Sequence, residues 1–100
     1  MLTRKKVLDV LQAEMRFLAA EFGVSKIGLF GSFAKGQPVE TSDIDIVVEF
    51  ERPIGFRFIE LGEYLENLLG RKVDILTPAG IQGIRIERVA KSVTESIVYV

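Results

Sequence analysis

The stretch Gly31–Asp45, GSFAKGQPVETSDID, decides the fold expected of this chain. It separates two apolar runs, one ending at Phe30 and one beginning at Ile44, and each run is typical of a buried strand. The residues between them include glycine, proline and serine, which favour turns and loops. A connection this short leaves no room for a helical crossover, so the two strands are expected to be antiparallel.

Asp43 and Asp45 stand at the start of the second run. Alternate side chains of a strand point to the same face, so the two carboxylates share one face and Ile44 and Ile46 share the other. At about 5 Å and an effective dielectric near 20, two such charges repel by about 3 kcal/mol. A divalent cation such as Mg²⁺ would reverse the sign of this interaction, because it binds carboxylate oxygens.

Gly31 and Ser32 form the other half of the pattern. A glycine at a strand-to-helix turn allows a ligand to approach the backbone closely. The helix start that follows offers free N–H groups to a phosphate. A phosphate cradle beside metal-binding acids is what nucleotide chemistry requires.

Composition excludes several classes of protein. One hundred residues favour a single domain, residues 1–100. A net charge of −1 gives no basic surface for stable nucleic-acid binding. The chain has no cysteine and no histidine, which excludes thiolate chemistry and every mechanism with a histidine base. We find no signal peptide and no membrane span, and a cytoplasmic protein is expected.

Hydrophobic periodicity predicts the remaining elements. We expect helices over 3–22 and 56–69, with Thr3 and Gly23 capping the first helix and Gly70 ending the second. Strands are expected over 24–30, 43–50 and 71–76, and a short helical turn over 32–35 with Gly36 ending it. Residues 81–94 permit a helix, and residues 96–100 are either an edge strand or a helix tail. The order of elements predicts an α/β (α+β) domain, a small mixed β-sheet flanked by helices.

Asp74 is the third acid of interest, because it lies in a strand of otherwise apolar or basic residues. On its own it would be an ordinary strand-end residue facing water. Arg52, Arg57 and Lys72 are either helpers of the same site or solvated surface charges, and the second interpretation is favoured.

Together these residues resemble the minimal nucleotidyltransferases of the DNA polymerase β superfamily. The resemblance rests on Gly31-Ser32-Phe33-Ala34-Lys35-Gly36, on Ser42-Asp43-Ile44-Asp45 and on Asp74, and it covers nearly the whole chain. Lys35 stands where arginine is commoner in the family, which keeps the charge but loses the planar fork.

The resemblance implies a polymerase β-type nucleotidyltransferase fold and a set of residue roles. Gly31, Ser32 and Lys35 would bind the triphosphate of ATP. Asp43 and Asp45 would ligate two Mg²⁺ ions, and Asp74 would ligate one of them and help to activate the attacking hydroxyl. A two-metal clamp needs no histidine, which agrees with the composition.

Family resemblance also implies a partner, because members pair with a HEPN-domain ribonuclease toxin. The nucleotidyltransferase is then a type VII antitoxin that transfers AMP from ATP to a toxin tyrosine. Two alternatives stay open: a non-catalytic antitoxin that neutralises its toxin by binding, and nucleotidyl transfer to a small molecule. A protein partner would need an exposed apolar patch, for which Leu2, Ile54, Phe56 and 98–100 are candidates.

Overall fold

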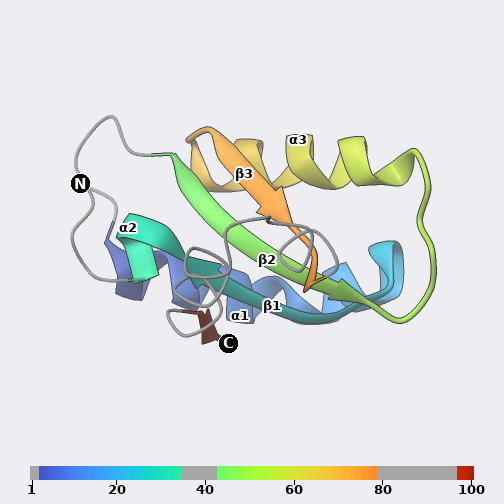
Figure 1. The fold of residues 1–100 in the computed structure, drawn as a ribbon, viewed down its shortest axis with the longest axis horizontal. Helices are drawn as coiled ribbons and strands as arrows, with labels where there is room; N and C mark the ends of the chain where they lie inside the picture. The colour runs from blue at the N-terminus through green and yellow to red at the C-terminus, as the bar shows by residue number, and fades with distance from the viewer. Residues whose placement is uncertain (1–2, 35–42, 79–96) are drawn as a thin grey trace.

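A computed structural model describes residues 3–34, 43–78 and 97–100, with the side chains of Ser32 and Phe33 excepted (Figure 1). The elements in chain order are α1 (Arg4–Phe22), β1 (Val24–Phe30), α2 (Gly31–Ala34), β2 (Ile44–Phe50), α3 (Arg57–Leu69), β3 (Val73–Leu76) and β4 (Val98–Tyr99). Each expected helix and strand among these residues is present, with bounds that differ by at most two residues. Of the two possibilities for 96–100, the edge strand is correct. The helix considered over 81–94 lies outside the described residues.

Local signals fix the ends of the helices. The Thr3 hydroxyl accepts a hydrogen bond from the Lys6 amide at 3.2 Å, which satisfies one free donor of the first turn of α1. Gly23 ends α1 and Gly70 ends α3, both with their amides bonded back to helix carbonyls. The three capping residues expected from the sequence are therefore confirmed.

The four strands form one mixed sheet in the order β3-β2-β1-β4. β1 pairs with β2 and with β4 in antiparallel orientation, and β2 pairs with β3 in parallel. The antiparallel pair follows from the short connection after Phe30, and the parallel pair follows from α3, which connects β2 to β3.

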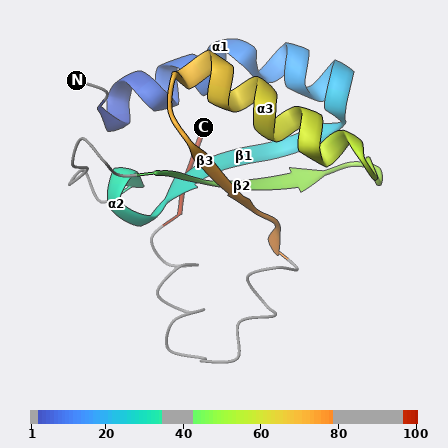
Figure 2. The same cartoon turned by 90° about the horizontal axis from the view of Figure 1, so that it is seen from above.

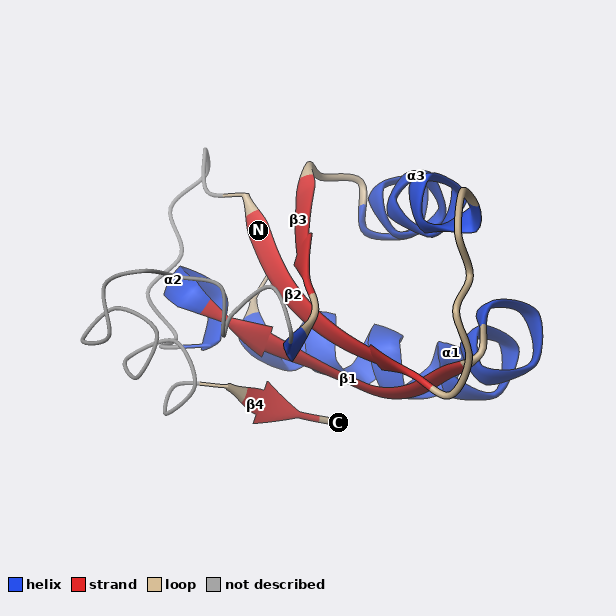
Figure 3. Cartoon of the chain, turned by 45° about the vertical axis from the view of Figure 1, so that its right-hand side comes forward, coloured by secondary structure: helices blue, strands red, loops and turns tan. Residues whose placement is uncertain are grey.

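Both long helices, α1 and α3, cover the same face of the sheet (Figures 2 and 3). Their buried side chains, such as Leu11 and Leu65, pack in one cluster with Ile44 and Ile46 of β2. The opposite face carries a smaller cluster that contains the buried side chains of Phe30 and Val47, with Leu76 and Ile97 packed against it. Alternation along β2 puts Asp45 on this second face, away from α1 and α3.

No helix in the described part of the chain is both long enough and apolar enough to cross a membrane.

Candidate functional site

Strand register brings two of the predicted acids side by side. Asp45 pairs with Phe30 across the antiparallel ladder and with Asp74 across the parallel ladder. Neighbouring strands lie about 4.8 Å apart, so Asp45 and Asp74 are neighbours on one face. Asp43 stands two residues before Asp45, just ahead of β2. The start of β2 and β3 therefore carries the three acids that the sequence singled out.

Gly31 lies beside the acids at the end of β1. It directly follows Phe30, the residue opposite Asp45, and it adopts a φ of +71°. A Cβ atom built on Gly31 would collide with Oδ2 of Asp45 and lie 3.1 Å from its Cγ. The Asp45 carboxylate thus occupies the space that any other residue at position 31 would fill. Gly31 is required both for its backbone conformation and for this close approach.

Electrostatics at Asp45 are unfavourable for its charged form. Partial burial raises the pKa of the Asp45 carboxyl above its usual value, and the negative charges of Asp74 and then Asp43 raise it further. The repulsion expected from the sequence is therefore present, with Asp74 as its larger source. An acid placed in this way costs stability unless a cation binds beside it.

The donor set suits a hard cation, since all three side chains offer only carboxylate oxygens. Among the described residues, however, no three acidic side chains stand close enough together to hold an ion between them as they are placed. Asp74 is exposed and Asp43 is half-buried, so both have space to rotate toward Asp45. The three residues fit Mg²⁺ in chemistry and in the face that they share, with a rotation of side chains needed to complete the site.

The phosphate half of the site is described in part. Gly31 and Ser32 lie in α2, which begins directly at the end of β1, as the strand–turn pattern predicts. Lys35, Gly36 and Ser42 lie outside the described residues. The nucleotide-binding role expected of Lys35 stays a prediction.

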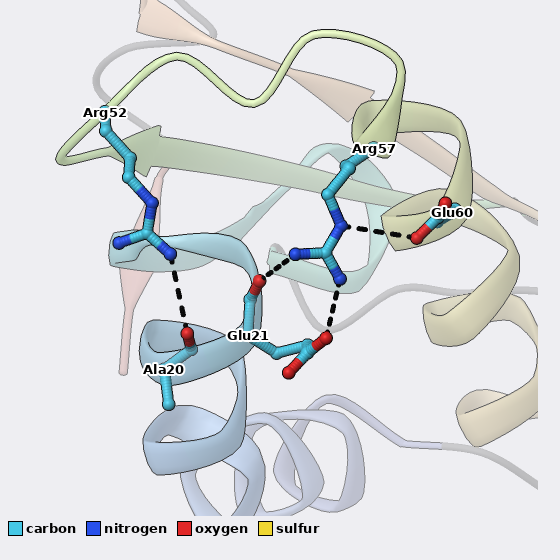
Figure 4. Close-up of polar contacts among 5 residues, drawn as sticks. All are labelled: Ala20, Glu21, Arg52, Arg57 and Glu60. Atoms are coloured by element: carbon cyan, nitrogen blue, oxygen red, sulfur yellow. Dashed lines mark hydrogen bonds and ion pairs between the residues drawn. The ribbon is translucent and has the colours of Figure 1, made fainter.

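Two arginines that were candidate helpers have a different function. Arg52 donates to the carbonyl of Ala20 at 3.4 Å, and Arg57 donates to the carbonyl of Glu21 and at 2.7 Å to its carboxylate (Figure 4). The last carbonyls of a helix lack partners within the helix, and α1 has no basic residue in its own last turn. Arg52 and Arg57 therefore bind the end of α1. The favoured interpretation of surface charges is confirmed, since these contacts are exposed, and the structure adds that both guanidinium groups bind carbonyls at a helix end.

Sequence reasoning missed Arg4, the first residue of α1. Its Nη1 donates to the carbonyl of Ala34, the last residue of α2, at 3.0 Å. One signal could have found it: a basic residue at a helix start is disfavoured by the helix dipole, so an arginine there needs a partner elsewhere.

A hollow among the described residues does not contain the three acids. It has a volume of about 460 Å³ and lies at the far ends of β2 and β3, lined by Val48–Pro53, Thr77 and Pro78. Asp43, Asp45 and Asp74 stand at the opposite ends of these strands.

A model of the nucleotidyltransferase domain family matches residues 11–100. This chain belongs to that family. Over its whole length it is 43% identical to the protein adenylyltransferase MntA of Thermococcus cleftensis, of which the alignment covers 98%. It is 40% identical over the whole of both chains to a Methanocaldococcus jannaschii protein to which the same activity is provisionally assigned.

Solved structures share the fold of this chain. One, provisionally described as a minimal nucleotidyltransferase, superposes with a TM-score of 0.75 at 28% identity and covers 97% of this chain and 95% of its own. Another, a toxin–antitoxin crystallised with AMP-PNP, has a TM-score of 0.63 at 22% identity and covers 98% of this chain and 72% of its own. The expected nucleotidyltransferase fold is confirmed, and the chain is a nucleotidyltransferase.

Proposed function

We propose that this nucleotidyltransferase is a Mg²⁺-dependent protein adenylyltransferase that transfers AMP from ATP to a tyrosine hydroxyl of a HEPN toxin, and so acts as a type VII antitoxin. The observation that carries the proposal is the row Gly31, Asp45, Asp74: the close-approach glycine lies against the Asp45 carboxylate, and Asp45 pairs with Asp74 on the next strand. The single domain would act in the cytoplasm, where ATP is available, without stable nucleic-acid binding.

The residues divide between binding and chemistry. Two Mg²⁺ ions, when bound, neutralise the triphosphate and lower the pKa of the acceptor hydroxyl. Asp43 and Asp45 would hold both ions from the start of β2. Gly31, Ser32 and Lys35 would bind the triphosphate, with backbone N–H groups of α2 pointing at phosphate oxygens.

Asp74 would serve the acceptor. It is exposed on β3, so a hydroxyl from another molecule can reach it. In the transfer step the acceptor oxygen bonds to the α-phosphorus, the bond from that phosphorus to the bridging oxygen breaks, and pyrophosphate leaves. The hydroxyl proton passes to the Asp74 carboxylate.

Three observations support a protein as acceptor. The relative at 43% identity is named a protein adenylyltransferase. A neighbour in fold is a toxin–antitoxin with a bound ATP analogue. The surface also exposes apolar side chains: Phe56 is 92% exposed, Ile59 64% and Tyr99 46%. Of the patch expected from the sequence, Ile54 is half-buried and Leu2 lies outside the described residues.

The test is a transfer assay with ATP labelled at either the α- or the γ-phosphate, Mg²⁺, and the product of the neighbouring gene. We expect the α label on a tyrosine of that protein, and no γ label. Asp45→Asn should abolish transfer, with Lys5→Gln as the control, since Lys5 pairs with the exposed Asp9 in its own helix.

Each failure has its own meaning. Transfer of the γ label would indicate a kinase and refute the proposal. Neutralisation of the toxin by Asp45→Asn as well as by wild type would favour the binding-only antitoxin. Labelling of a small molecule in place of the protein would favour the third alternative.

A further inference from the structure

Arg4 and Ala34 are thirty residues apart in sequence and joined by a hydrogen bond in the fold. Nη1 of Arg4 donates to the Ala34 carbonyl at 3.0 Å in a partly buried setting. The bond links the first turn of α1 to the last residue of α2, the turn that carries Gly31 and Ser32.

Arg4 is poorly placed for its own helix. The first turn of α1 contains Arg4, Lys5 and Lys6 and no acid, although the start of a helix is its positive end. Lys5 finds a partner one turn later, in Asp9 at 3.0 Å. Arg4 instead reaches out of α1, so its contribution lies in what it binds.

What Arg4 binds is the backbone carbonyl at the end of α2, at Ala34, whose side chain is itself buried in the main core. This helix has four residues, too few to satisfy its own last carbonyls. A guanidinium donating to a carbonyl forms a charge-assisted bond, stronger than a neutral one. At the other end of α2, Gly31 packs against the Asp45 carboxylate. The turn is thus fixed at one end by the acid group and at the other by Arg4.

We propose that Arg4 is a positioning residue for nucleotide binding: it holds the end of α2 so that the backbone N–H groups of the Gly31-Ser32 turn point at the triphosphate. This inference rests on the proposed function. Arg4 lies before residues 11–100, the range that the family model matches.

A positioning role predicts a larger effect on affinity than on stability. α1 is anchored to the sheet by fully buried side chains such as Val7, Leu11 and Leu18. Loss of one peripheral hydrogen bond leaves that packing intact. It removes the bond that orients the Ala34 carbonyl, while the buried Ala34 side chain keeps α2 on the core, so the phosphate-binding amides lose part of their preorganisation.

The experiment compares Arg4→Met, Arg4→Lys and Lys5→Met in the full chain. Lys5→Met is the matched control, because it also removes one cation from the first turn of α1. Calorimetry measures the Kd of AMP-PNP with Mg²⁺, and thermal melts without nucleotide measure stability. We expect Arg4→Met to raise the Kd about fivefold to tenfold and Lys5→Met to leave it within about twofold. Arg4→Lys, which keeps a donor but not the fork, should fall between them.

Several results would overturn the inference. Arg4→Met with wild-type affinity would do so, as would equal losses in Arg4→Met and Lys5→Met, which would indicate a general effect of charge. If affinity fell and recovered only in step with the melting temperature across Arg4→Met and Arg4→Lys, Arg4 would be merely structural. If Arg4→Met fails to fold, the test is the Kd of AMP-PNP for Arg4→Lys, which should be higher than that of wild type and of Lys5→Met. If the wild-type protein bound no AMP-PNP, the proposed function itself would be refuted. If wild type bound it and Arg4→Met bound it equally well, only the inference about Arg4 would be refuted.

Discussion

The variant Gly31→Ala tests why a glycine is needed beside Asp45, and two physical reasons apply. The first reason is backbone conformation: an L-residue with a Cβ atom in the left-handed region costs about 1 to 2 kcal/mol, and Gly31 has a φ of +71°. The second is space, since the new Cβ would collide with the Asp45 carboxylate. The backbone cost affects stability alone. Displacement of the carboxylate affects the site.

Gly70→Ala is the matched control. Gly70 has a φ of +67°, but a Cβ there would meet nothing within 4 Å. A change of 1 kcal/mol shifts the melting temperature of a domain this size by about 4–8 °C, so the backbone cost predicts a fall of about 4–16 °C in either variant. The two variants should therefore have similar melting temperatures within that range, with Gly31→Ala the lower.

The decisive assay is binding of ATP–Mg²⁺ by calorimetry. We expect Gly70→Ala to bind as wild type does, and Gly31→Ala to lose about tenfold or more in affinity. A double-mutant cycle with Asp45→Ala isolates the contact, because Gly31→Ala should cost less stability once the carboxylate is gone. Equal affinity of the two glycine variants, or an additive cycle, would refute the reasoning from the Gly31–Asp45 contact.

Three further outcomes are expected. In EDTA, Asp45→Asn should have a higher melting temperature than wild type, and the difference should grow from about pH 4 to pH 7. Folding raises the pKa of Asp45, so the wild-type protein loses stability as this carboxyl ionises. A difference that does not depend on pH would contradict this assignment. Asp74→Asn should bind ATP–Mg²⁺ within a few-fold of wild type yet lose transfer by on the order of 10²-fold, and a parallel fall in both would put Asp74 in the nucleotide site instead. Arg57→Met should lower the melting temperature more than Lys5→Met, because it removes bonds to the end of α1 as well as one charge; identical melts would mean that these bonds add nothing.

Short-range patterns predicted most of the fold. The 3.6-residue spacing of apolar side chains and the caps Thr3 and Gly23 are contained within α1, so its bounds could be predicted from the sequence. The short connection after Phe30 fixed the antiparallel pairing of β1 and β2. Alternation in the strand placed Asp43 and Asp45 on one face without knowledge of any partner.

Long-range contacts could not be predicted in this way. Only the register of β3 against β2 makes Asp74 the neighbour of Asp45, and that register depends on how α3 packs. The bond from Arg4 to Ala34 and those from Arg52 and Arg57 to α1 join distant segments through single side chains. A single long-range polar contact produces no periodic pattern in a sequence. Sequence analysis therefore interprets arginines of this kind as surface charges.

Arg4, Arg52 and Arg57 bind backbone carbonyls at helix ends and are not among the groups that influence the pKa of Asp45. The influences on Asp45 all raise its pKa. A guanidinium beside Asp45 would lower that pKa and stabilise the metal-free fold, but it would also occupy the carboxylate oxygens and repel a divalent ion. Among the described residues, no cationic side chain is found to lower the pKa of Asp45, which costs stability and keeps its oxygens available to a metal ion. That cost is recovered when a cation binds the folded state, because a ligand that binds only the folded protein stabilises it. The same arrangement that makes the acid row unfavourable for folding is therefore the one that a metal-dependent transferase needs.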